Sequence, residues 1–276
     1  NNAGRSYVVL GKTDSTAINL SNVAARIGGF VINGQCQEDW SGMSVSSAGD
    51  VNGDGLADVI VGAAKSFASG RALSGRSYVV FGKTNNSGVN LSAVAGGAGG
   101  FAINGQDERD YSGYSVSGAG DVNGDGLADL IVGAPSDFSD GVSQVGKSYV
   151  VFGKTTVESI SLSALGSGGF VINGQANNDR SGMSVSNAGD VNGDGLADLI
   201  VGAPYSDPAT GANAGRSYVV FGKSVSGSID LSTVEAGTGG FVINGQSLNE
   251  FSGFKVSSAG DVNGDGLADL IVSAPI

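Results

Sequence analysis

The chain has 276 residues, of which 26 are acidic and 14 basic, so its formal net charge is −12 at pH 7. It contains 49 glycines, one cysteine and no histidine. The charge disfavours nucleic acid or an anionic membrane as a partner, and the missing histidine and single cysteine exclude histidine catalysis, an intrachain disulfide and a thiolate metal cluster. Frequent glycine, serine and β-branched residues between turn signals indicate an all-β protein.

The expected strands follow one another in a fixed order. Two apolar segments come first, within residues 4–11 and 30–34. A complete unit has four, at residues 115–119, 130–134, 148–152 and 170–173, which we name strand types a, b, c and d. Type b is apolar throughout, as expected for a strand covered on both faces, whereas type a has small alternating residues that suit the crowded centre of a radial structure. The chain ends with one a and one b strand.

The sequence repeats itself four times. The eleven residues AGDVNGDGLAD recur at 48–58, 119–129, 188–198 and 259–269, with a period of about 70 residues. A unit of this length with four antiparallel strands has the size of one β-propeller blade. We therefore expect one all-β propeller domain over residues 1–276, with repeat units at 41–110, 111–179 and 180–251 and a closing blade formed by 1–40 and 252–276.

The ends of the chain carry complementary halves of one blade. If the N-terminal c and d strands pair with the C-terminal a and b strands, four blades of four antiparallel strands close into a ring without exposed edges. The alternative is an eight-bladed ring made by two chains that exchange these strands. The sequence thus leaves open a monomer or a strand-exchanged dimer.

Each repeat contains an oxygen-rich loop, DVNGDGLAD, which we call the acidic loop. Side-chain oxygens stand at its positions 1, 3, 5 and 9, and the backbone carbonyl of the leucine at position 7 can add a fifth ligand, a pattern typical of calcium sites. The alternative is a simple Asp-Gly hairpin turn, which needs no aspartate at position 9. The candidate Ca²⁺ ligands, one site per repeat, are Asp50, Asn52, Asp54, Leu56 and Asp58; Asp121, Asn123, Asp125, Leu127 and Asp129; Asp190, Asn192, Asp194, Leu196 and Asp198; and Asp261, Asn263, Asp265, Leu267 and Asp269.

These loops stand between two further motifs, FG at Phe81 and Gly82 and GAP at residues 133–135. Together the motifs resemble the FG-GAP repeat of the integrin α-subunit N-terminal β-propeller. The resemblance implies calcium on one face of the propeller, ligands on the opposite face, and a non-catalytic extracellular role in cell adhesion or protein recognition. The chain departs from the pattern in having four units instead of seven, LG at 10–11, GAA at 62–64 and SAP at 273–275.

The loops from strand d to strand a vary between repeats and predict the ligand face. Equivalent positions hold Trp40, Tyr111, Arg180 and Phe251. Aromatic and arginine side chains suit a protein or glycan ligand, and the alternative is that they cap the apolar end of each blade. The b-to-c loop at 136–147 carries further acids that could join such a site.

Three interpretations of function follow: an adhesion or recognition module, a lectin-like carbohydrate-binding propeller, or an accessory propeller of a larger surface protein or enzyme. No segment resembles a signal peptide or a membrane span, so we expect a soluble extracellular or cell-surface chain whose export signal lies outside these residues. Cys36 is expected to be an ordinary loop thiol.

Overall fold

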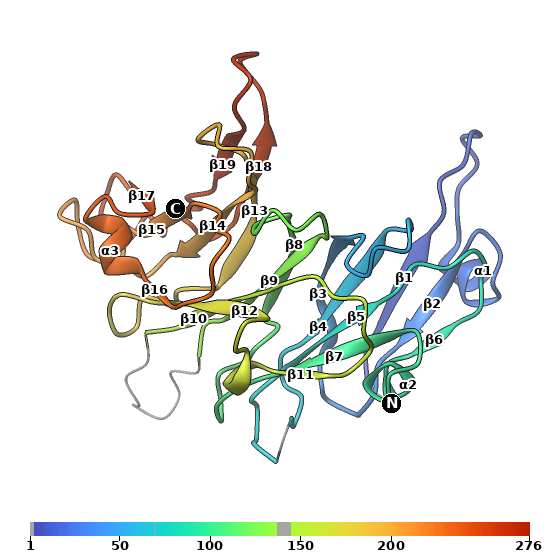
Figure 1. The fold of residues 1–276 in the computed structure, drawn as a ribbon. Coiled ribbons are helices and arrows are strands. Elements are labelled where there is room, and N and C mark those ends of the chain that lie inside the picture. The colour runs from blue at the N-terminus through green and yellow to red at the C-terminus, as the bar shows by residue number, and fades with distance from the viewer. Residues whose placement is uncertain (1–2, 69, 137–144) are drawn as a thin grey trace.

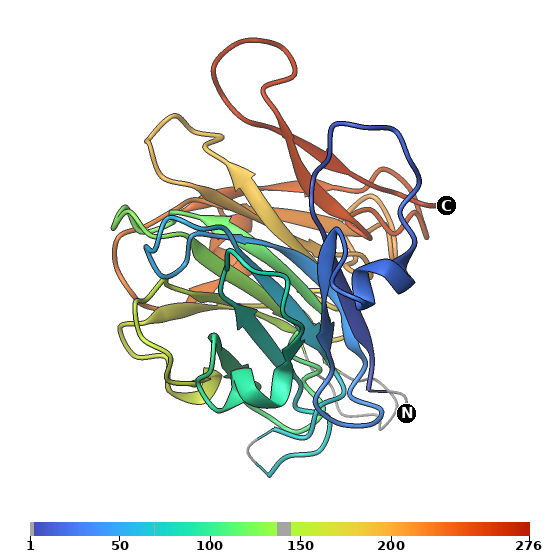
Figure 2. The ribbon, with the colours of Figure 1, turned by 90° about the vertical axis from the view of Figure 1, so that its right-hand side faces the viewer.

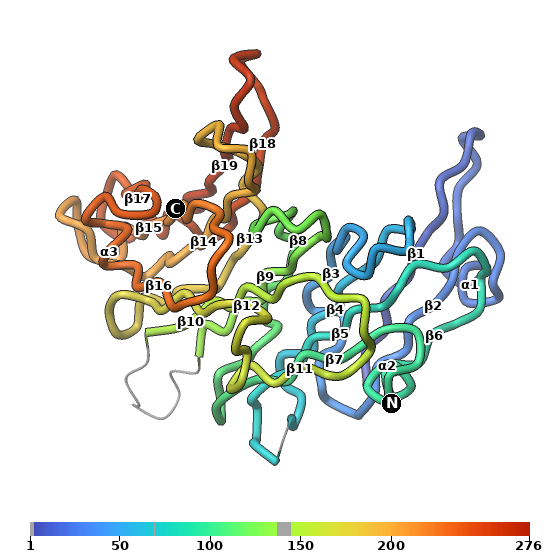
Figure 3. The backbone as a smooth tube through the Cα atoms, in the orientation of Figure 1, coloured from blue at the N-terminus to red at the C-terminus, as the bar shows by residue number. Residues whose placement is uncertain are grey.

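A computed structural model describes residues 3–68, 70–136 and 145–276. These parts of the chain form three whole four-stranded blades and two partial ones. The blades stand in a row that follows the chain from one end to the other (Figure 1, Figure 3). The predicted all-β propeller architecture with four-stranded units is therefore confirmed.

The two partial blades lie at the ends of the row. Strand β1 (Arg5–Val9) pairs antiparallel with β2 (Gly29–Asn33), and the short helix α1 (Leu20–Ala24) lies between them in sequence. Because these are strands of types c and d, we call the pair the first half-blade. Strands β18 (Val256–Gly260) and β19 (Asp269–Val272) are of types a and b and pair antiparallel as the last half-blade.

Each whole blade is an antiparallel meander of strands a, b, c and d. The first consists of β3 (Ser41–Gly49), β4 (Asp58–Ala63), β5 (Arg76–Val80) and β7 (Gly100–Asn104). The second consists of β8 (Ser115–Gly120), β9 (Asp129–Ala134), β10 (Lys147–Val151) and β12 (Gly169–Asn173). The third consists of β13 (Ser184–Gly189), β14 (Asp198–Ala203), β15 (Arg216–Val220) and β17 (Gly240–Asn244).

Short segments after strand c connect each blade to the one before it. β6 (Val89–Asn90), β11 (Ile160–Ser161) and β16 (Ile229–Asp230) pair in parallel with β2, β7 and β12, the outermost strands of the preceding blades. They are followed by α2 (Leu91–Ala95), the 3₁₀ turn η1 (Leu162–Ala164) and α3 (Leu231–Glu235). The sequence pattern does not predict these short elements.

The core lies between the blades. Phe101 and Ile103 of β7 pack in one cluster with Tyr149 and Val151 of β10, and all four are fully buried. Burial of one such side chain contributes about 1.5–3 kcal/mol to the free energy of unfolding. The same positions pack at the next interface: Phe170, Ile172, Tyr218 and Val220. The stability of each blade therefore depends on its neighbours.

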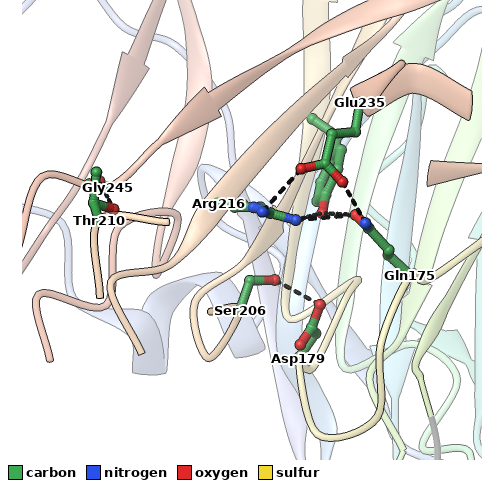
Figure 4. Close-up of polar contacts among 8 residues, drawn as sticks. Gln175, Asp179, Ser206, Thr210, Arg216, Glu235 and Gly245 are labelled. Atoms are coloured by element: carbon green, nitrogen blue, oxygen red, sulfur yellow. Dashed lines mark hydrogen bonds and ion pairs between the residues drawn. The ribbon is translucent and has the colours of Figure 1, made fainter. Parts of the chain in front are cut away.

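A polar contact also recurs between blades. The Tyr218 hydroxyl donates to Gln175 Oε1 of the preceding blade at 2.7 Å, and Arg216 donates to the same oxygen at 3.1 Å. Arg216 also pairs with Glu235 at 2.9 Å (Figure 4). The tyrosine–glutamine bond recurs at Tyr78–Gln35 and Tyr149–Gln106. Because tyrosine and glutamine occupy the same positions in each repeat, this contact fixes how neighbouring blades align.

The innermost strands are crowded, as their small residues predicted. Strand β8 adjoins β3 on one side and β13 on the other. A Cβ at Gly118 would lie 2.8 Å from the Ser47 carbonyl oxygen, and one at Gly49 would lie 2.5 Å from the Ala128 Cβ. Both glycines permit an approach between blades that a larger side chain would obstruct.

The two half-blades stand at opposite ends of the row (Figure 1). Among the strands of the described residues, β19 pairs with β18 and β1 with β2, and no pairing joins β19 to β1. The ring closure expected from the sequence therefore stays a prediction.

Replacing Phe170 with alanine should lower the free energy of unfolding by about 3–5 kcal/mol, because it leaves a cavity between two blades. Phe67→Ala, at an exposed loop position, is the control and should cost no more than about 0.5 kcal/mol. Urea unfolding of both variants measures the difference. Equal losses in the two variants would contradict a core located between blades.

Candidate functional site

The four acidic loops connect strand a to strand b in every repeat. The loops after β13 and β18 project from the same edge of the molecule (Figure 2). In the first loop, the Asp50 carboxylate accepts the backbone N–H groups of Gly53 at 2.8 Å, Asp54 at 3.1 Å and Gly55 at 2.8 Å. Asp121, Asp190 and Asp261 accept the equivalent groups. Position 1 therefore organises the turn.

Positions 3 and 5 are joined to each other. Asn52 Oδ1 accepts the Asp54 N–H at 2.9 Å, while Asn52 Nδ2 donates to Asp54 Oδ2 at 3.0 Å. Asp54 Oδ1 accepts the N–H of Leu56 at 2.8 Å. Gly53 and Gly55 have φ values of 75° and 86°, in the left-handed region that the loop was expected to require. The structure thus brings positions 1, 3 and 5 together in one turn.

Position 9 forms a contact that the sequence pattern does not predict. Asp58 is 1% exposed; its Oδ2 accepts the Val51 N–H at 2.9 Å and its Oδ1 accepts the Gly82 N–H at 2.7 Å. Since Gly82 is the glycine of the FG motif, this aspartate links the acidic loop to the end of strand c. We call this contact the Asp–Gly clamp. It recurs at Asp129–Gly153 and Asp198–Gly222.

Burial and nearby charge determine the electrostatics of the clamp. Desolvation raises the pKa of Asp129 to about 6, against the lowering effect of the Gly153 and Val122 N–H groups. The carboxylates of Asp125 and Asp121 raise this pKa further. Burial likewise raises the pKa of Asp58 and Asp198. Each of these three loops therefore holds three carboxylates close enough to repel one another.

Two carboxylates in the outer part of the loops, Asp190 and Asp265, have a lowered pKa instead. Backbone hydrogen bonds, that of Gly195 first, lower the pKa of Asp190, and the Leu267 N–H lowers the pKa of Asp265. These groups are therefore held in the ionised form that a cation ligand needs.

The chemistry of these donors fits a hard divalent cation, since each loop offers carboxylate and amide oxygens and no nitrogen or sulfur ligand. Within residues 3–68, 70–136 and 145–276, however, no group of three or more His, Cys, Asp or Glu side chains is arranged to hold a metal ion. Many loop oxygens accept N–H groups of the loop itself. The ligand assignments, including the carbonyl oxygens of the four leucines, stay predictions.

The d-to-a loops place the four variable residues in one conformation. Trp40, Tyr111, Arg180 and Phe251 have φ values of 55°, 53°, 54° and 54°, although none is glycine. Phe251 packs edge-on against Tyr205 at 5.0 Å between ring centroids, and the Arg180 guanidinium lies 4.2 Å from the same ring. These two side chains thus contact Tyr205, in the b-to-c loop of the third blade.

Trp40 differs from its equivalents. It is 47% exposed, with Lys65 Nζ 3.5 Å from its ring centroid. It lines a cavity of about 690 Å³ together with Phe67, Arg76 and the exposed thiol of Cys36. Most of the b-to-c loop at 136–147, with its predicted acids, lies outside the described residues. One cavity on the predicted ligand face therefore lies beside Trp40.

The four-stranded blades and their repeated acidic loops together define a propeller of FG-GAP-type blades. The FG-GAP repeat model matches residues 41–80, 112–151, 181–220 and 253–276, and the chain belongs to this family. It is 30% identical over 231 residues to integrin alpha-PS2 of Drosophila melanogaster, covering 82% of this chain and 14% of the relative. It is 32% identical over 248 residues to integrin alpha pat-2 of Caenorhabditis elegans, covering 87% of this chain and 18% of the relative. Over 182 residues it is 34% identical to integrin alpha-5 of Xenopus laevis, covering 63% of this chain and 16% of the relative.

The predicted resemblance is confirmed by these similarities. The chain spans less than one fifth of the length of each of these three relatives. None of the helices in the described residues is long and apolar enough to cross a membrane.

Replacing Asp129 with alanine should destabilise the protein by about 1–3 kcal/mol even in a chelator, because the buried N–H of Val122 and the partly buried N–H of Gly153 lose their acceptor. Asp14→Ala, in an exposed loop, is the control and should have a small effect. Denaturant unfolding in EDTA isolates the clamp from any bound metal. If Asp129→Ala were as stable as the parent there, the clamp would have no structural role.

Proposed function

We propose that the chain is a calcium-binding β-propeller, a single domain over residues 1–276, that serves as a non-catalytic extracellular adhesion or protein-recognition module. The observation that carries this proposal is the fourfold, all-oxygen acidic loop in a chain of the FG-GAP repeat family. The loops recur unchanged at one edge of the blades, while the loops at the opposite edge differ from repeat to repeat.

Calcium is the cation that the loop chemistry favours. Ca²⁺ takes six to eight oxygen ligands in flexible geometry, whereas Mg²⁺ demands a strict octahedron and keeps more of its water. In the first loop the ion would be held by Asp50, Asn52, Asp54 and Asp58 with the carbonyl of Leu56. Bound Ca²⁺ would offset the mutual repulsion of the carboxylates, and four ions would change the net charge from −12 to −4.

An extracellular or cell-surface location agrees with this chemistry. Ordinary sites of this kind are filled where calcium is plentiful, and the cytosol holds too little calcium to fill them. The similarity to integrin alpha chains supports the same location and a protein ligand. No nucleic acid is expected as a partner of so acidic a chain.

The ligand is proposed to bind at the d-to-a loops, around Trp40, Tyr111, Arg180 and Phe251. Trp40 is the strongest candidate because its ring is half exposed beside a cavity. The same exposed ring favours a second candidate function, a lectin-like site in which a sugar stacks on the indole. A glycan-binding screen with no positive sugar would remove that candidate. An accessory role in a larger surface protein or enzyme is compatible with either ligand.

Removing calcium should lower the melting temperature. An ion bound only by the folded state stabilises it, by about 2.7 kcal/mol per site when calcium is 100 times its dissociation constant. Thermal melting in calcium and in EDTA tests this, and titration calorimetry of Asp121→Ala should show three sites in place of four. An unchanged melting temperature in EDTA would refute the calcium proposal.

Replacing Trp40 with alanine should reduce attachment of cells to the immobilised chain at least tenfold, because truncating an exposed aromatic anchor costs more than about 1.4 kcal/mol of binding. Val225→Ala is the control, since Val225 is also an exposed apolar residue but follows strand c, at the opposite edge. Attachment is counted in calcium for both variants. Equal attachment by the two variants would show that the ligand does not bind at Trp40.

A further inference from the structure

The first blade differs from the other whole blades in how the basic residue that begins strand c is paired. In the third blade, Arg216 Nη2 forms an ion pair with Glu235 Oε1 at 2.9 Å (Figure 4). In the second blade, Lys147 has the equivalent position and pairs with Asp107 at 3.4 Å. In the first blade the basic residue is Arg76, and no carboxylate in the described part of the chain forms an ion pair with it.

The cause is a difference in residue type. Ala95 of α2 stands where α3 has Glu235, so the first blade lacks the carboxylate. Arg76 still donates from Nη1 to Gln35 Oε1 at 2.9 Å, and from Nε to Asn104 Oδ1 at 2.8 Å. Its Nη2 has no partner among the residues that the structure describes. The guanidinium is therefore held in place with one donor group left over.

A second cation without an ion pair comes from the b-to-c loop of the same blade. Lys65 stands where the next two repeats have Ser136 and Tyr205. Its Nζ lies 3.5 Å from the Trp40 ring centroid, and no described carboxylate pairs with it. In the third blade the same two loops make this contact with the roles exchanged, since the cation is Arg180 and the ring is Tyr205. The free ammonium group is thus specific to the first blade.

Arg76 and Lys65 line the same cavity, the one beside Trp40. Its volume of about 690 Å³ lies within the range of roughly 300–1,000 Å³ that is usual for ligand sites. Phe67 and Leu73 add apolar surface to the ring of Trp40. The cavity therefore offers two positive groups next to apolar side chains.

Two acidic residues, Glu38 and Asp39, line the cavity as well. Asp39 is 7% exposed and its Oδ2 accepts the Cys36 N–H at 3.3 Å, so this carboxylate is engaged within its own loop. Glu38 is exposed. Neither acid forms an ion pair with Lys65 or Arg76. A carboxylate that enters the cavity therefore meets two cations that no direct ion pair compensates, while Glu38 opposes its binding.

We propose that this cavity binds an acidic peptide segment of a protein ligand. An aspartate or glutamate of the ligand pairs with Arg76 and Lys65, and an adjacent apolar side chain packs against Trp40 and Phe67. This assignment rests on the proposed recognition function. The ligand carboxylate takes the place of the one that the third blade supplies from its own helix, and guanidinium–carboxylate pairs are among the stronger polar contacts. An acidic glycan fits less well, because its hydroxyl groups would lose water against apolar side chains.

The first test selects ligands from a displayed library of short random peptides on the immobilised chain in calcium. The selected peptides should contain an aspartate or glutamate next to an apolar residue. Selection on Arg76→Gln should lose these peptides, whereas selection on Arg216→Gln should retain them. Arg216→Gln is the matched control, because it removes the equivalent hydrogen bond to a glutamine at another blade interface. No enriched peptide, peptides without an acid, or the same peptides on Arg76→Gln would overturn the proposal.

Fluorescence gives a direct readout, because Trp40 is the only tryptophan of the chain. A selected peptide should change the emission of Trp40 on titration, and replacing its acid with the corresponding amide should weaken binding about 10- to 100-fold. Lys65→Gln should also weaken binding, which keeps the test valid if Arg76→Gln does not fold, and Glu38→Gln should strengthen it. Equal affinities of the acid and amide peptides would show that no carboxylate is recognised.

Cell attachment separates this proposal from the proposed function. If both hold, attachment falls for Arg76→Gln as it does for Trp40→Ala. If attachment falls only for Trp40→Ala, the ligand face stands and the carboxylate contact is wrong. If oligosaccharides ending in sialic acid or glucuronate change the emission of Trp40 and acidic peptides do not, the ligand is an acidic glycan and the peptide assignment is overturned.

Discussion

The structure depends on the contact between neighbouring blades. Strand b of each whole blade is apolar on both faces, so a single sheet leaves one or both of its faces in water unless another blade covers them. Two clusters of buried side chains form this contact between blades. One contains Phe101 and Tyr149, and the other contains Phe170 and Tyr218. This constraint explains why the unit repeats.

The acidic loop contributes to this architecture in two ways. Its first residues form a compact turn around the carboxylate of position 1, and its last aspartate, Asp58 in the first loop, reaches across to the FG glycine at Gly82. A hydrogen bond therefore joins the acidic motif to the FG motif, and both motifs hold the strands of one blade together. A cation at the outer part of the loop would act on strands a and b directly and on strand c through this buried aspartate.

Much of this arrangement could be predicted from the sequence. The strands expected at 115–119, 130–134, 148–152 and 170–173 agree within one residue at each end with β8, β9, β10 and β12, because turn residues bound each apolar segment. The Asp58–Gly82 bond could not be predicted, since it joins residues far apart whose neighbourhood depends on how strand c pairs. Two-residue strands such as β6 are too short for a periodic pattern. The identical interfaces fit a closed monomer as well as an exchanged dimer, so the sequence could not decide how the ring closes.

The central claim is that the repeated loop is a calcium site as well as a turn. The most direct measurement is the metal content of the purified chain after dialysis against buffer containing both Ca²⁺ and Mg²⁺, determined by atomic emission. The account predicts four calcium ions per chain and little magnesium, with one calcium lost for each loop whose position-1 aspartate is replaced by alanine. A chain that retains no calcium under these conditions would show that DVNGDGLAD serves only as a structural turn.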